Sequence, residues 1–304
     1  MRLAGLTERV TGREWGRGGG RGYTPGVPAE RIGESLAFIN WTVLTALGVG
    51  SFAAVVVGRL RTDATKGYLG FTAFSAAVFA LLAWLADTGL PVLSPDLALR
   101  ADPTWDAARR VALLALAVIA LVYAVRLFRG HRSFAVAAAG LVAAGAVLVT
   151  GALSWGGGGL ASLLLVVELG AISAVLGGVW ASMILGHWYL VTPKLPELPL
   201  VRFSRWLGWA LVVQLVLFGL WIGLGAGPSG SPAFAALFGP WALFVWLRLL
   251  VGLVFPIIVS WAAVQTARTR SMESATGLLY INVGTIAAGT ILAAGLYFGA
   301  GLLV

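Results

Sequence analysis

Long apolar runs separated by short polar segments dominate the chain from residue 35 onward. A helix needs about 20 mostly apolar residues to cross the hydrocarbon core of a bilayer. Eight runs fit this requirement, and most are apolar around the whole helical circumference rather than along one face. They cover Ser35–Val57, Tyr68–Leu90, Val111–Phe128, Phe134–Trp155, Leu160–Leu190, Phe203–Leu224, Phe234–Thr266 and Ala275–Leu303. The pattern predicts an all-α, polytopic transmembrane helix bundle of about eight membrane-spanning helices.

Residues 1–33 break this pattern and form a separate region. They contain six Arg and three Glu, and residues 17–22 read Arg-Gly-Gly-Gly-Arg-Gly. So few apolar side chains cannot offset the entropy cost of folding, so we expect a flexible Arg/Gly-rich tail. A solvated tail near anionic lipid is favoured over a nucleic-acid-binding role. Residues 34–304 then form the transmembrane bundle.

Composition supports lipid as the main solvent. The chain is 59% hydrophobic and 11% charged, with a mean hydropathy of +0.92. Soluble domains are typically about 25% charged, so an ordinary soluble enzyme and a disordered protein are both excluded. Cysteine is absent, which excludes disulfides and thiolate chemistry. No nucleotide-binding, hydrolase or metalloprotease motif is present, so the sequence predicts neither a catalytic site nor a metal site.

The positive charges between the runs predict an orientation. Eleven Lys and Arg residues lie at the loops after the first, third, fifth and seventh runs, whereas the other loops hold only Arg100, Arg109 and Arg110. The positive-inside rule places the first group of loops in the cytoplasm. We therefore expect a multi-pass protein of a bacterial-type inner cell membrane. The same arrangement places the six Arg of the tail outside, which the rule disfavours.

Two ionisable residues interrupt the apolar runs. Glu168 follows Leu-Leu-Leu-Val-Val, and Arg248 lies within Val-Trp-Leu-Arg-Leu-Leu-Val. A charge in the hydrocarbon costs about 2.5–3.5 kcal/mol on insertion scales and usually faces the protein interior. The run boundaries place Glu168 about 12 Å and Arg248 about 21 Å from the same membrane face. We hypothesise that they pair near the midplane, either to hold two helices together or to form part of a substrate or ion pathway.

Pro256 and Gln214 extend this candidate pathway. Pro256 lies inside the seventh run, where it is expected to kink the helix, and broken helices line the binding sites of transporters. Gln214 in the sixth run and Asn282 in the eighth can donate hydrogen bonds between helices. The spacings Gly140/Gly145 and Gly295/Gly299/Gly301 are small-residue patterns that permit close packing of helices.

The string His187-Trp188-Tyr189 closes the fifth run, and three prolines follow it within ten residues. Trp and Tyr favour the membrane interface, so an aromatic belt followed by an extended connector is the simplest interpretation. His131 precedes the fourth run at the same predicted face. Two imidazoles on neighbouring helices can ligate a haem iron, and one imidazole can contact a quinone. His187, Trp188, Tyr189 and His131 are therefore candidate quinone or haem contacts.

One local string resembles a known family. Asp87-Thr88-Gly89-Leu90-Pro91 is similar to the Asp-Leu-Gly-x-Pro ending of NrfD-like quinol-interacting membrane subunits. The match covers five residues and departs at Thr88, so it carries over no functional residue. It implies a membrane subunit of a redox complex, with iron–sulfur subunits as partners.

Two functional classes follow, together with one class that involves no chemistry. The first is a small-molecule or ion transporter or permease with Glu168 and Arg248 in its path, which the sequence favours by a narrow margin. The second is a quinone- or haem-contacting membrane subunit of a respiratory complex, with other membrane or redox subunits as partners. The third is a membrane scaffold. The lipid bilayer is a partner in all three.

Overall fold

The computed structural model describes residues 28–93, 99, 101–131, 133–192 and 195–304. Within these residues the chain is helical and contains no strand. Among the described residues, eight helical segments are long and apolar enough to span a membrane, as the sequence predicts, and one of them, Ala242–Arg268, is made of α8, η3 and α9 together. The elements are α1 (Pro28–Glu34), α2 (Leu36–Arg61), α3 (Lys66–Thr88), η1 (Pro103–Trp105), α4 (Asp106–Phe128), α5 (Phe134–Trp155), α6 (Gly159–Val191), α7 (Leu198–Leu224), η2 (Ala235–Leu237), α8 (Ala242–Leu249), η3 (Leu250–Val254), α9 (Phe255–Arg268) and α10 (Met272–Ala300).

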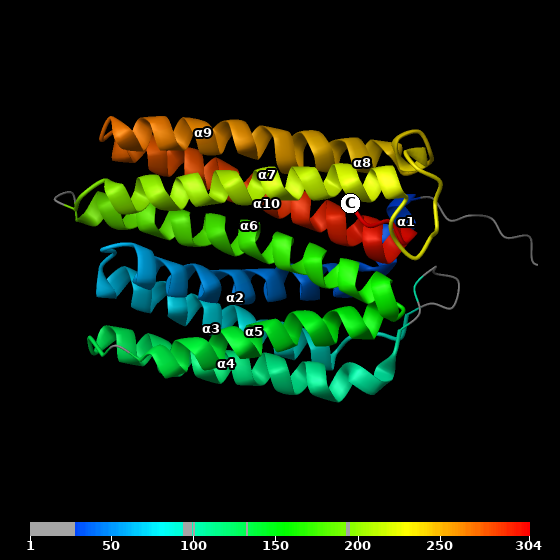
Figure 1. Cartoon of the computed structure of the whole chain (residues 1–304), viewed down its shortest axis with the longest axis horizontal. Helices are drawn as coiled ribbons and strands as arrows, with labels where there is room; N and C mark the ends of the chain where they lie inside the picture. Colours follow the sequence, from blue (N-terminus) through cyan, green and yellow to red (C-terminus); the bar gives the residue numbers. More distant parts are fainter. Residues whose placement is uncertain (1–27, 94–98, 100, 132, 193–194) are drawn as a thin grey trace, which may run out of the picture.

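The long helices lie side by side in two groups, with α6 between them (Figure 1). One group contains α2 to α5, in which α3 packs on α2 and α4. The other contains α7 to α10, in which α9 packs on α7 and α10. Helix α6 contacts α2 and α5 in the first group and α7 and α10 in the second. Helix α6 is therefore the main element between the two halves of the bundle, and α2 also contacts α10 directly.

The outer surface of the bundle is apolar. Large hydrophobic side chains such as Phe71, Leu121, Val142, Val213 and Ile258 are exposed along the spans. In lipid this exposure has no hydrophobic cost, and the helices satisfy their own backbone hydrogen bonds. The architecture is that of a multi-pass integral membrane protein.

The bundle has two distinct ends. The connections after α2, α4, α6 and α9 lie at one end, which we call the basic end because it carries Arg59, Arg61, Arg129, Arg202 and Arg270 (Figure 1). Helix α1 and residues 301–304 lie at the opposite end. There the chain leaves α10 through Gly301, which adopts a left-handed conformation, and the Leu303 amide donates to the Ala226 carbonyl. The eighth helix thus ends before the predicted limit at Leu303.

The tail predicted for residues 1–33 differs from the structure in its last part. Residues 28–33 belong to helix α1, which packs against α10. Ile32 lies beside Gly295, and Arg31 lies beside Gly299, so α1 packs on the part of α10 that carries these two glycines. Residues 1–27 lie outside the described part of the chain.

Three helices begin at least about one helical turn away from their predicted starts. Helix α4 begins at Asp106, so Arg109 and Arg110 lie in a helix and not in a loop. Helix α8 begins at Ala242, because residues 234–241 form a connection that includes η2. Helix α7 begins at Leu198 and contains Pro199, which belongs to its first turn and not to an extended connector. Proline is tolerated there because the first amides of a helix have no intrahelical partner.

Small residues set the closest helix contact in the bundle. Gly50 of α2 lies directly against Gly177 of α6, and a Cβ at either position would overlap the backbone of the other helix. Of the predicted pair Gly140/Gly145, only Gly140 lies in a close contact. Gly140 lies against the Phe52 ring, whereas no neighbouring helix lies within 4 Å of a Cβ built at Gly145. The junction between the two halves therefore depends on Gly50 and Gly177.

This contact predicts opposite effects of the same substitution at two glycines. Gly177→Ala forces α2 and α6 apart, and overpacking of this kind costs about 1–3 kcal/mol. Gly145→Ala adds a methyl group that meets open space and raises helix propensity, so it should be neutral or stabilising by up to about 1 kcal/mol. Thermal unfolding of both variants in mild detergent measures the difference. Equal stabilities would contradict the assignment of Gly177 to a tight contact.

Candidate functional site

The structure brings Glu168 and Arg248 together inside the bundle. Glu168 lies on α6 and Arg248 on α8, with 3.7 Å between Oε1 and Nη2. Their side chains are only 5% and 1% exposed. Because α8 starts at Ala242, Arg248 lies about 9 Å from the start of its helix, and Glu168 lies about 14 Å from the start of α6. The later start of α8 reduces the depth difference between the two residues from about 9 Å to about 5 Å.

Helix α7 supplies two more polar groups to the same carboxylate. The Trp221 indole Nε1 donates to Glu168 Oε2 at 3.0 Å. The Gln214 side chain is also buried and lies near Glu168. Gln214 and Trp221 are seven residues apart, so they lie on one face of α7. Three helices therefore meet at Glu168.

The Glu168–Arg248 pair leaves several of its hydrogen-bonding atoms without partners. Glu168 Oε1, Arg248 Nε and Arg248 Nη2 are buried without a hydrogen-bond partner among the described residues. The 3.7 Å separation exceeds the 2.7–3.2 Å typical of an N–H···O hydrogen bond. A buried polar atom without a partner costs about 1–3 kcal/mol, and more when it is charged. The site therefore retains hydrogen-bonding capacity that a small polar ligand could take up.

A small cavity adjoins the carboxylate. It has a volume of about 20 Å³ and lies between α2, α6 and α10. Glu168 lines it together with Thr42, Trp155, Tyr297 and residues 303–304. This volume accommodates about one water molecule.

The backbone around Arg248 is irregular. Gly252 lies against Gly289 of α10, and a Cβ at Gly252 would approach both the Gly289 Cα and the Arg248 guanidinium. Residues 250–254 form the π-helix η3, a conformation that often marks functional sites. Pro256 follows in the first turn of α9, and the wider π-turn accommodates its missing amide hydrogen. Pro256 lies about 12 Å along the helix from Arg248.

Asn282 joins α10 to the region around Pro256, as the sequence suggests. Its Nδ2 donates to Ser260 Oγ at 2.8 Å and to the Pro256 carbonyl at 3.3 Å. Asn282 therefore links α9 and α10 and does not contact the Glu168–Arg248 pair.

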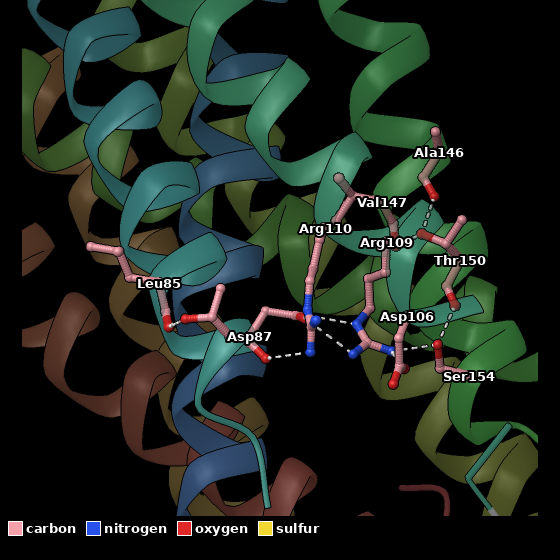
Figure 2. Close-up of polar contacts among 10 residues, drawn as sticks. Leu85, Asp87, Asp106, Arg109, Arg110, Ala146, Val147, Thr150 and Ser154 are labelled. Carbon is pink, nitrogen blue, oxygen red and sulfur yellow. Dashed lines mark hydrogen bonds and ion pairs between the residues drawn. The ribbon is translucent and has the colours of Figure 1, made fainter. Parts of the chain in front are cut away.

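A second buried ionic cluster, which the sequence did not reveal, lies near the end of the bundle that is opposite the basic end (Figure 2). Asp87 of α3 is fully buried and accepts hydrogen bonds from Arg109 and Arg110 of α4. Arg109 also pairs with Asp106 at 2.9 Å and donates to the Ser154 hydroxyl of α5. No buried nitrogen or oxygen of the described Asp87 and Arg109 side chains lacks a partner. The cluster therefore joins three helices through a completed network.

Aromatic rings complete the surroundings of Arg109. Its guanidinium carbon lies 4.4 Å from the Trp155 ring centroid and 5.9 Å from that of Trp41. These distances allow cation–π attraction. Trp155 also lines the small cavity next to Glu168, so it separates the two buried ionic sites.

The structure separates the residues proposed to contact a quinone or haem. His187 and Trp188 line a cavity of about 430 Å³ on the surface of α3, α6 and α10, where His187 Nδ1 lies 3.5 Å from the Tyr280 hydroxyl. The Tyr189 hydroxyl instead donates to the Pro196 carbonyl. His131 lines a different cavity, between α2, α4 and α5. The two histidines are therefore not brought to one site.

Asp87 and Trp221 belong to buried polar sites that the sequence did not reveal. They differ in how far the sequence marks them as unusual. Asp87 lies within the predicted run 68–90, so its intramembrane charge was visible, but its partners appeared to be loop residues. Trp221 shows no signal, because a tryptophan in a transmembrane segment is most often a lipid-facing or interfacial side chain.

The Asp87 cluster predicts unequal roles for neighbouring arginines. Arg109→Gln leaves Asp87 without its buried partner, and breaking a buried pair typically costs about 3–5 kcal/mol. Arg110 is 42% exposed, so Arg110→Gln should cost no more than about 1 kcal/mol. Unfolding of both variants in detergent tests the difference. A milder effect at Arg109 than at Arg110 would contradict a structural role for the network.

Comparisons with protein-family models, with curated proteins and with solved structures of known proteins found no match to this chain.

Proposed function

We propose that this protein is a membrane transporter for a proton or small ion, with the Glu168–Arg248 pair as the polar site on the path. The observation that carries the proposal is the incomplete satisfaction of two buried charges in a lipid-spanning bundle. Ionisable residues at such positions are costly and commonly mark ion pathways or proton relays. The completed Asp87–Arg109 network shows that this fold can satisfy a buried pair fully when the pair joins helices.

The size of the cavity limits the substrate. A space for about one water molecule at Glu168 fits a proton carried through water or a partly dehydrated small ion. Drug-sized ligands occupy about 300–1,000 Å³, so a large organic solute needs a different site. Gln214 and Trp221 offer further hydrogen-bonding groups to whatever binds at the carboxylate.

The backbone next to Arg248 supports a moving part. The Gly252–Gly289 contact places no side chain between α10 and η3, so small sliding movements meet little steric resistance. A π-helix and a proline follow within eight residues of Arg248. Displacement of this segment would change the distance between Arg248 and Glu168. In this proposal, Glu168 and Arg248 pair with each other when they are close, and they bind the transported ion when they are apart.

The proposal predicts that Glu168→Gln reduces transport. The amide keeps the shape of the side chain and its oxygen can still accept from Trp221, but it cannot exchange a proton or balance a cation. Proteoliposomes loaded with a pH-sensitive dye, under an imposed potential, should show flux at least about tenfold lower than wild type. Parallel assays use Na⁺, K⁺ and Cl⁻ as the probe ions. Glu273→Gln, which removes an exposed carboxylate at the basic end, is the matched control and should transport normally.

A double variant distinguishes transport from a purely structural pair. Glu168→Gln alone leaves Arg248 as an unpaired buried charge and is expected to destabilise the fold. Glu168→Gln combined with Arg248→Met removes both charges and should recover stability without recovering flux. Wild-type flux in the double variant would show that the pair only joins helices, and it would overturn the proposal.

A second candidate function rests on the cavity around His187. Its volume of about 430 Å³ and its lining by Phe71, Trp180, Trp188 and Tyr280 suit a planar ring such as a quinone head. The imidazole and the phenol can hydrogen-bond to a quinone carbonyl. This arrangement supports the role of a quinone-contacting membrane subunit.

The quinone role predicts that decylubiquinone binds saturably. The binding is measured by the quenching of tryptophan fluorescence. His187→Ala should weaken this binding about tenfold, because it removes a polar contact in an apolar pocket. His131→Ala is the matched control and should bind as wild type does. Quenching that never saturates, or that is unchanged in His187→Ala, would remove this candidate.

A further inference from the structure

A cavity of about 490 Å³ at the basic end is lined by cationic groups from three parts of the chain. Arg59 and Arg61 come from the end of α2, and Arg202 comes from α7. His131, between α4 and α5, adds an imidazole. Asp63 also lines the cavity, so three guanidinium groups face one carboxylate. This cavity belongs neither to the Glu168 site nor to the His187 site.

The guanidinium groups are available to a ligand. Among the described residues, Arg59, Arg61 and Arg202 form no ion pair with a carboxylate. Arg202 Nη1 donates to the Arg61 carbonyl at 2.7 Å, which fixes α7 against the end of α2. That bond uses one of the five N–H donors that an arginine carries. The remaining donors suit a phosphate oxygen, which arginine binds in a bidentate manner.

A buried tyrosine provides an independent observation. Tyr123 of α4 is only 3% exposed and lines the same cavity. Its ring packs against Phe52, but its hydroxyl forms no hydrogen bond with a described residue. Arg59 lies close enough to act electrostatically on it. The hydroxyl is not among the fully buried polar atoms, so it is open to the cavity, where it can donate to an acceptor held by the neighbouring arginines.

The cavity also has an apolar side that faces the membrane. Leu60 and Phe134 line it and are 61% and 77% exposed, so they form an apolar wall at the outer surface of the bundle. Val56, Leu127 and Ala137 continue the apolar lining into the bundle. A free inorganic anion needs no such wall, whereas a phospholipid places its acyl chains there. Basic pockets between transmembrane helices are known to bind anionic lipid head groups.

We propose that this cavity is a binding site for one anionic phospholipid. The phosphate lies between Arg59 and Arg202 and accepts from the Tyr123 hydroxyl, and the acyl chains run along Leu60 and Phe134. A bound lipid would tie α2, α4 and α7 together at this end of the bundle. This inference is independent of the transport proposal, because it uses none of the same residues.

Lipid titration of the full-length protein tests the site. The delipidated protein in detergent is titrated with phosphatidylglycerol, phosphatidylcholine or inorganic phosphate, and bound molecules are counted by native mass spectrometry. We expect one tightly held phosphatidylglycerol, with phosphatidylcholine at least about tenfold weaker. Arg59→Gln and Arg202→Gln should each weaken phosphatidylglycerol binding about tenfold. Arg205→Gln removes an arginine of α7 that lies outside the cavity, and it should bind as wild type does.

Tyr123→Phe is a second variant that tests the same site if an arginine variant does not fold. It removes one hydroxyl and keeps the ring against Phe52, and it should weaken the lipid about threefold to tenfold. Inorganic phosphate that competes fully with phosphatidylglycerol would assign the cavity to free anions and overturn the lipid proposal. Equal binding of both lipids, or unchanged binding in Arg59→Gln and Tyr123→Phe, would also overturn it.

Discussion

The need to neutralise charge inside an apolar bundle is the constraint on which the rest of this structure depends. In the described residues, four charged side chains are buried: Asp87, Arg109, Glu168 and Arg248. Lipid offers no water to stabilise them, so each must find its partner within the protein. The helices that supply these partners are held in a fixed relation to one another. Asp87 fixes α3 to α4 and α5, and Glu168 fixes α6 to α7 and α8.

The two buried ionic sites meet this constraint to different degrees. Arg109 bonds to two carboxylates and a hydroxyl and is stacked on Trp155, so its charge is fully accommodated. The Glu168–Arg248 pair has a longer separation and leaves three polar atoms without partners. A completed network is rigid because any movement breaks hydrogen bonds, whereas an incomplete one can rearrange at low cost. This difference, within one molecule, is the physical basis for proposing a structural role for the first site and a transport role for the second.

Helix α6 has a central part in both the fold and the proposed chemistry. Its Gly177 allows the close contact with α2, and its neighbours in the other half are α7 and α10. Glu168 lies toward one end of this helix, and His187 lies toward the other. An element packed on both sides cannot shift freely, so in the proposed transport cycle the movement takes place in the partner segment around Arg248. The π-helix and the Gly252–Gly289 contact are located on that segment.

The sequence could predict part of the candidate site. Glu168 and Arg248 were visible because each interrupts a long apolar run, and the number of spans placed both on helices that start at one face. Trp221 was not visible, since its role depends on which face of α7 turns toward α6. Asp87 was visible as a charge but not as part of a network. The apolar run of α4 begins after Arg109 and Arg110, so their helical position could not be read from hydropathy.

The sequence by itself determined the solvent of this protein, its helical class and the number of its spans. Hydrophobicity over about 20 residues is a local property, and in lipid a single segment must satisfy its own backbone by forming a helix. Only the tertiary structure decided which helices are neighbours, which glycines permit contact and which charges are neutralised. These depend on the rotation and order of helices that are apolar on every side, so no polar face records their orientation in the sequence. For that reason, the sequence could identify Glu168 and Arg248 as unusual, whereas only their packing shows that they meet and that their pairing is incomplete.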